Sequence, residues 1–189
     1  MKTLQLNNCG DLDLVAFTGH RPCKLGGYDE DNYRIVEVKK ILRKAIIERI
    51  EDGCDGFISG MAMGVDIWAA EIVLELKEKY PHIKLVAAVP FEGQQKMWPY
   101  PSQERWRNVL GAADHVEYVC DPGYAPWKMQ KRNEWMVNSA KWLIAIWDGT
   151  KGGTGNCVAY AKKNNIEIVH KVPPRELTYP HVDINVKDD

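Results

Sequence analysis

The chain has 189 residues, of which 45% are hydrophobic and 27% charged, which excludes wholesale disorder and indicates about one folded domain. Its 25 basic and 26 acidic residues leave a net charge of −1, so the charge signature of a nucleic-acid binder is missing and DNA is not an expected partner. The longest apolar run has six residues (142–147), whereas a membrane span needs roughly 20. The first ten residues lack the apolar segment of a signal peptide, so we expect a cytoplasmic protein without a membrane partner.

Short apolar runs alternate with segments of helical periodicity. The runs predict strands at 14–18, 57–59, 84–89, 115–119, 142–147 and 166–170. The periodic segments predict helices at 33–51, 64–80, 102–113, 126–140 and 154–164. Strands separated by helices form right-handed βαβ units. The sequence therefore predicts an α/β, Rossmann-like three-layer fold with a mainly parallel sheet, in which residues 1–172 form a single domain and 173–189 an appendage or tail.

The cysteines and tryptophans bear on cofactors and interfaces. The five cysteines are scattered and odd in number, and no pair has Cys-x-x-Cys spacing, so we expect reduced thiols, no metal and no cofactor. Trp98, Trp106 and Trp127 lie in polar or proline-rich surroundings, where an aromatic side chain often lines a pocket or an interface. The oligomeric state is not fixed by these features, and a homo-oligomer stays open.

Glycine-rich segments follow four of the predicted strands, at 18–22, 59–66, 89–94 and 148–156. Ligands bind at the carboxyl ends of the strands in parallel open sheets. We therefore expect one pocket at this edge of the sheet. Its walls are predicted to be residues 19–21, 59–66, 91–94 and 149–154, with Gly19, His20, Arg21 and Phe91 as contacts.

The segment 59–66 is neither a dinucleotide Gly-x-Gly-x-x-Gly motif nor a P-loop. Its glycines allow backbone N–H groups to approach a phosphate or ribose at a helix N-terminus. The candidate ligand-binding residues are Ser59, Gly60, Met61, Gly64 and Asp66. Asp66 has two interpretations, as a carboxylate that complements the helix dipole or as an acceptor for ribose hydroxyls, and both stay open.

The segment 148–156 follows a buried strand and precedes a helix. Asp148, Gly152, Gly153 and Thr154 are therefore candidates for binding an anion. The alternative is a flexible loop whose helix is capped by Thr154 or Asn156.

The helix predicted at 126–140 carries two polar residues in an apolar stripe. The shared face is formed by Met129, Arg132, Asn133, Met136, Val137 and Ala140. A buried Arg and Asn are costly unless they are paired or face a ligand. Arg132 is therefore either an anion contact or a structural residue, in a core ion pair or with its charged group extending to the edge of the core. On the first interpretation, Arg132→Ala weakens anion binding by ~1.5–3 kcal/mol and leaves the fold intact.

Five motifs in order resemble the YpsA/YoqJ-like family of bacterial and phage proteins. They are Thr18–Pro22 with Leu25–Tyr28, Ser59–Trp68, Val89–Phe91, Arg132–Val137 and Lys151–Thr154. That family belongs to the SLOG superfamily, together with the DNA-processing protein DprA and the Lonely-guy phosphoribohydrolases. The resemblance implies a Rossmann-like fold that binds nucleotides or nucleotide-derived signals.

The resemblance leaves catalysis open. Lonely-guy enzymes carry Pro-Gly-Gly-x-Gly-Thr-x-x-Glu, whereas this chain has Lys151 in place of the proline and no Glu between Gly149 and Ile166. The leading hypothesis is therefore a nucleotide binder acting as a sensor, carrier or sequestering protein. One alternative is a nucleoside-monophosphate N-glycosidase using Asp66, Glu71 or Glu92. The other is a protein-interaction module with a vestigial nucleotide site.

Overall fold

The computed structural model describes residues 12–174, which form one sheet covered by helices. The strands are β1 (Leu14–Gly19), β2 (Gly56–Ser59), β3 (Lys84–Val89), β4 (His115–Tyr118), β5 (Trp142–Ile146) and β6 (Glu167–Lys171). The helices are α1 (Tyr33–Glu51), α2 (Val65–Leu76), α3 (Tyr100–Ala112), α4 (Pro126–Ser139) and α5 (Gly153–Lys163), with a short 3-10 helix at Pro22–Lys24. The strand order is β4-β3-β2-β1-β5-β6, and every pairing is parallel.

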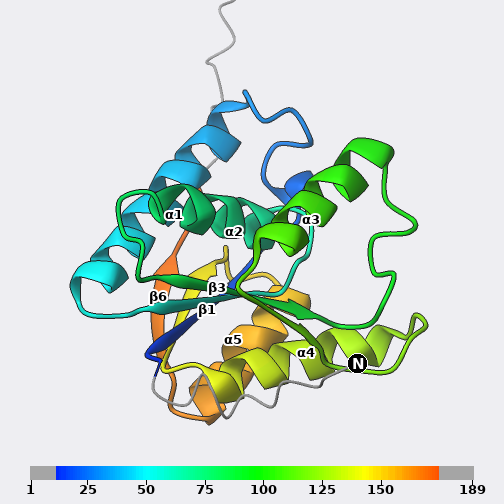
Figure 1. Cartoon of the computed structure of the whole chain (residues 1–189). Helices are drawn as coiled ribbons and strands as arrows, with labels where there is room; N and C mark the ends of the chain where they lie inside the picture. The colour runs from blue at the N-terminus through cyan, green and yellow to red at the C-terminus, as the bar shows by residue number, and fades with distance from the viewer. Residues whose placement is uncertain (1–11, 175–189) are drawn as a thin grey trace, which may run out of the picture.

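Helices α1, α2 and α3 cover one face of the sheet, and α4 and α5 cover the other (Figure 1). Strand β1 shows how its sequence serves both layers, because successive side chains of a strand point to opposite faces. Val15 and Phe17 pack with α1–α3, whereas Leu14 and Ala16 pack with α4 and α5. This arrangement confirms the Rossmann-like three-layer prediction.

Two helix boundaries differ from the sequence-based expectation by two residues or more, and one tryptophan lies elsewhere than expected. Helix α2 ends at Leu76, not at Tyr80, because residues 77–80 form a tight turn ahead of Pro81, which disfavours helix in the residue before it. Helix α3 begins at Tyr100, two residues earlier than expected, with Pro101 in its first turn. Trp106 lies in the core rather than at a pocket or surface.

The order of the strands creates a crevice between β1 and β5. The chain leaves β1 through α1 toward β2, whereas it leaves β5 through α5 on the opposite face toward β6. The loops after these two adjacent strands therefore diverge, which is the usual position of a ligand site in such sheets. None of the helices in residues 12–174 is long and apolar enough to cross a membrane, and residues 175–189 of the expected tail lie outside the described part.

Candidate functional site

A pocket of ≈ 400 Å³ lies at the carboxyl ends of β1 and β5. Helices α2 and α4, the first turn of α5 and the 3-10 helix supply further lining residues. The expected contacts that line it are Gly19, His20, Arg21, Asp66, Arg132, Asn133, Gly152, Gly153 and Thr154. Three of the four segments predicted to form its walls therefore converge.

A buried ion pair forms one wall of the pocket. The Nη1 group of Arg132 donates to Asp66 Oδ2 at 3.4 Å, and its Nε donates to Asn133 Oδ1 at 3.0 Å. Among the described residues Nη2 has no partner, so this nitrogen is available to a ligand. Arg132 thus combines both interpretations, as an ion-pair member and as a charged group in the pocket wall.

Burial and charge act in opposite directions on this pair. Burial raises the pKa of Asp66, while the guanidinium groups of Arg132 and Arg21 and the N–H of Ala62 oppose that shift. Burial also lowers the pKa of Arg132, and the Asp66 carboxylate opposes that shift. Asp66 also accepts a hydrogen bond from the Ala62 N–H at 3.3 Å. Its carboxylate therefore holds both the segment after β2 and the Arg132 guanidinium in place.

Gly60 explains why the guanidinium fits where it does. A Cβ atom at this position would lie 1.9 Å from Nη1 of Arg132 and 2.7 Å from Oδ2 of Asp66. Ser59 and Met61 are fully buried behind the wall, where Ser59 Oγ donates to the Asp66 carbonyl and accepts from the Met61 N–H. The segment 59–61 therefore positions the charged pair and does not itself line the pocket.

The loop after β5 is tied to β1 through His20. Its Nε2 lies 2.7 Å from Asp148 Oδ1 and 3.3 Å from the backbone nitrogen of Asp148. The same Oδ1 accepts from the Thr150 N–H at 2.9 Å and from the Thr150 hydroxyl at 2.7 Å. Lys24 Nζ donates to Thr150 Oγ1 at 3.0 Å. His20 thus links the loop after β1 to the loop after β5, and both His20 and Arg21 line the pocket.

The hydroxyl of Thr150 is expected to control the acidity of Asp148. Its hydrogen bond, with smaller effects from the Thr150 N–H and His20, holds the pKa of Asp148 well below its ordinary range. Thr150→Val keeps the branched side chain and the N–H but removes the hydroxyl. We expect the pKa of Asp148 to rise toward its ordinary value, as measured by carboxyl-carbon NMR titration.

The matched control for this titration is Thr154→Val, which leaves the Asp148 contacts in place. A depressed carboxyl pKa contributes stability that is lost as pH falls. In Thr150→Val, the free energy of unfolding should therefore decrease less below about pH 4 than it does in the native protein. An unchanged Asp148 titration in Thr150→Val would contradict the assignment.

The N-terminus of α5 opens onto the pocket without a side-chain cap. Gly152 is the N-cap residue, with φ +144°, and its position provides no side-chain hydrogen bond to the N–H groups of the first turn. The expected alternative, a cap by Thr154 or Asn156, is therefore not what the structure shows. The uncapped N–H groups and the helix dipole favour an anion at this point. The basic residues around them are Arg21, Lys24, Arg132 and Lys151, against one lining carboxylate, Asp66.

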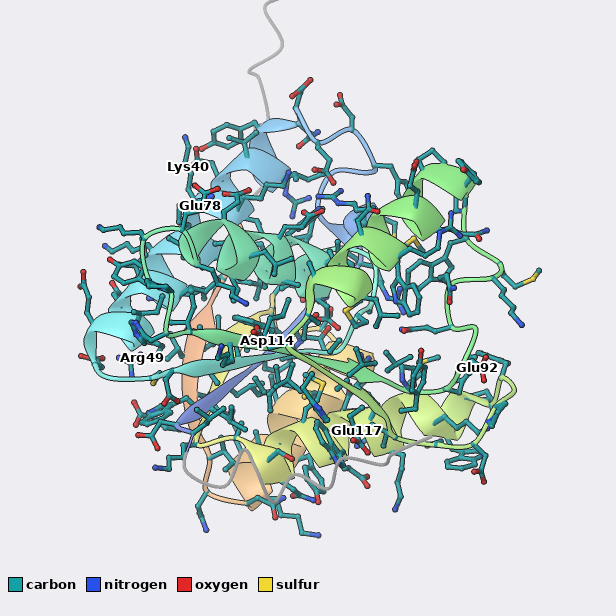
Figure 2. The ribbon with its side chains drawn as sticks, viewed as in Figure 1. Lys40, Arg49, Glu78, Glu92, Asp114 and Glu117 are labelled. Carbon is teal, nitrogen blue, oxygen red and sulfur yellow. The ribbon has the colours of Figure 1, made fainter. Side chains whose placement is uncertain are left out.

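Other expected residues lie elsewhere. Glu71 is bonded to Arg105 on the outer side of α2, and Glu92 lies at the periphery of the molecule (Figure 2). Gly64 faces a neighbouring pocket next to Pro22 and Trp68. Its φ of +94° favours glycine there, and so does the His20 carbonyl, which would lie 2.7 Å from any Cβ atom at this position. Phe91 lines an adjacent pocket, so residues 91–94 do not form a wall of the first one.

Several lining residues were not among the expected contacts. They are Cys23, Lys24, Ala62, Met129, Thr150, Lys151 and Gly155. Lys151 and Thr150 had a signal in the glycine-rich segment, where a basic and a hydroxyl side chain precede a helix. Lys24 had none, because its approach to Thr150 depends on the pairing of β1 with β5. Within residues 12–174 no cluster of His, Cys, Asp or Glu is arranged to hold a metal ion.

Comparison with known protein families covers most of the chain. A model of the family described as the YspA SLOG family matches residues 15–174. A UPF0398 protein of Bacillus thuringiensis (strain Al Hakam) is 32% identical over 162 residues, covering 84% of this chain and 88% of that protein. A UPF0398 protein of Bacillus cereus (strain AH187) matches with the same identity and coverage.

Two solved structures share the fold. DNA processing protein A (DprA) of Streptococcus pneumoniae aligns with a TM-score of 0.61 and 16% identity over 88% of this chain, which spans about half (52%) of that protein. DprA of Helicobacter pylori, whose structure concerns single-stranded DNA binding, aligns with a TM-score of 0.57 and 20% identity over 87% of this chain and 66% of that one. At these identities the likeness establishes the fold.

Proposed function

Because the chain belongs to the YspA SLOG family, we propose that its pocket binds a small nucleotide or nucleotide derivative through the phosphate. The observation that carries the proposal is the convergence of four basic side chains on the uncapped N-terminus of α5. The protein then acts as a sensor, carrier or sequestering protein for that ligand.

Backbone N–H groups, a buried guanidinium and exposed lysines each contribute differently to phosphate binding in this proposal. The N–H groups at Gly153 and Thr154 hold the phosphate oxygens, as at other helix N-termini. Arg132 offers its free Nη2 from a buried position, where a charge-assisted hydrogen bond is stronger than at an exposed one. Lys24 and Lys151 are exposed and add attraction that salt screens.

Hydrolysis of the ligand has less support than binding. Cleavage of an N-glycosidic bond uses a positioned carboxylate to activate water. Of the three candidates, Asp66 is engaged with Arg132 and Ala62, while Glu71 and Glu92 lie outside the pocket. We therefore propose binding without efficient turnover.

Single-stranded DNA is the second candidate ligand, despite the overall charge balance. Near the pocket the exposed aromatic residues Tyr124 and Trp127 are 72% and 59% accessible, and Lys131 lies beside Trp127 in the neighbouring groove. Stacking platforms next to basic side chains are typical of single-strand binding, and the H. pylori structure concerns such binding. The small-nucleotide proposal is preferred because four basic side chains line the same pocket.

Calorimetric titration with AMP, ribose 5-phosphate and an oligothymidylate tests the proposal. We expect AMP and ribose 5-phosphate to compete for one site, with affinity falling as salt is raised. Lys151→Met should weaken AMP binding about two- to fivefold, the contribution of an exposed charge. Lys162→Met, at the other end of α5, should have no effect.

Each alternative has its own result. Release of ribose 5-phosphate from AMP would establish the glycosidase. Oligothymidylate binding that AMP does not displace would favour single-stranded DNA. If the protein binds none of the three ligands, the protein-interaction module is the alternative that the result favours.

A further inference from the structure

A second pocket of ≈ 410 Å³ adjoins the phosphate pocket. Arg21 and Met129 line both of them. The remaining lining residues of the second pocket are Phe91, Gly93, Gln94, Met97, Trp98 and Tyr124. A ligand that extends beyond its phosphate therefore has a continuation within reach along Arg21 and Met129.

Gln94 is the unusual residue of this second pocket. Its side chain is 7% exposed, yet neither Nε2 nor Oε1 has a hydrogen-bond partner among the described residues. Buried amide groups are nearly always paired, since leaving them unpaired costs the lost hydration. The loop fixes its place, because Gly93 adopts φ +85° and the Gln94 N–H donates to the Phe91 carbonyl. Gln94 therefore lines the pocket with an amide whose donor and acceptor groups are both unpaired among the described residues.

The other walls suit a flat aromatic ring. Phe91 and Tyr124 meet edge to face, with centroids 6.0 Å apart and planes at 78°. Trp98 is half-buried, whereas Met97 and Tyr124 are exposed. Aromatic faces and thioethers pack against the face of any nucleobase, whereas an amide distinguishes one base from another by hydrogen bonds to its edge.

We propose that this pocket is the base subsite of the same ligand, and that Gln94 selects a purine of the adenine type. The inference rests on the phosphate site proposed above. An amide pairs bidentately with adenine, accepting from N6–H and donating to N7. The lining residues include no carboxylate, the group that would accept from guanine N1–H and N2–H. Arg21, on the boundary, is assigned to the phosphate side.

The test compares AMP with ribose 5-phosphate, which has the phosphate but no base. We expect Gln94→Met, similar in size but without an amide, to weaken AMP binding about tenfold and leave ribose 5-phosphate binding unchanged. Gln95→Met is the matched control, because Gln95 is adjacent but does not line the pocket. A misfolded variant would lose both ligands. A Gln94→Met variant with unchanged AMP affinity would overturn the proposal.

Changing the ligand checks the same contact from the other side. Purine riboside 5′-monophosphate lacks the N6 amino group, so it should bind the native protein more weakly than AMP and bind Gln94→Met equally to AMP. Tighter binding of GMP than of AMP to the native protein would overturn the adenine assignment. If ribose 5-phosphate itself does not bind, the phosphate site fails, whereas ribose 5-phosphate binding as tight as AMP binding refutes only the base subsite.

Discussion

Arg132→Met is expected to lower the free energy of unfolding by about 3 kcal/mol at pH 7, because it leaves the buried Asp66 carboxylate without its cation. Arg132→Ala would suffer the same loss together with a cavity, so its effect on the fold, expected from the sequence to be absent, is now predicted to be a larger loss of stability than that of Arg132→Met. Adding Asp66→Asn should restore most of the stability, since removal of both charges of a buried pair is often neutral. The double variant should bind AMP roughly 10- to 100-fold more weakly than the native protein, because the guanidinium contact is still missing.

The pH dependence of this variant has a definite sign. Without Arg132, burial raises the folded-state pKa of Asp66 further above its unfolded value. The folded state then holds a proton that the unfolded state has released, so stability falls as pH rises from about 4 toward the folded pKa. Urea unfolding should show a smaller deficit relative to the native protein at pH 5 than at pH 7. An equal deficit at both pH values, without rescue by Asp66→Asn, would assign Arg132 to packing alone.

Periodicity was sufficient for the fold and for part of the site. A helical period places Arg132 and Asn133 on the buried stripe of α4, and the alternation of strands and helices brings the loops after β1 and β5 to one edge. Arg132 has its partner 66 positions earlier in the chain, and no local pattern contains that pairing. The tertiary structure was needed to identify Asp66 as the partner of Arg132.

Gln94 and Gly60 show a second limit of prediction from the sequence, because their roles depend on residues that pack around them in the folded chain. Gln94 stands in a polar loop sequence, and only the packing of Phe91, Trp98 and Tyr124 around one pocket shows that its amide is buried. Gly60 and Gly64 look alike as loop glycines that admit a phosphate. The structure separates them, because one makes room for a guanidinium and the other has a positive φ beside the His20 carbonyl.

Gly60→Ala is expected to weaken AMP binding roughly 10- to 100-fold by displacing Arg132, the range for a lost charge-assisted hydrogen bond. The added methyl group would lie 1.9 Å from Nη1 and 2.5 Å from Cζ of the guanidinium. Gly60 does not have a positive φ, so alanine introduces no left-handed backbone strain and the effect is steric. Calorimetry measures the affinity, and urea unfolding measures the accompanying loss of stability.

Gly111→Ala is the matched control, because a methyl group there meets nothing within 4 Å. Gly111 lies in the last turn of α3, where alanine should be neutral or stabilising by up to about 1 kcal/mol. Its AMP affinity should equal that of the native protein. If Gly60→Ala also keeps native affinity, Arg132 does not contact the phosphate, and the anion is held by the α5 N-terminus and the exposed lysines alone. The stability loss of Gly60→Ala would then report only the strain on the Asp66–Arg132 pair.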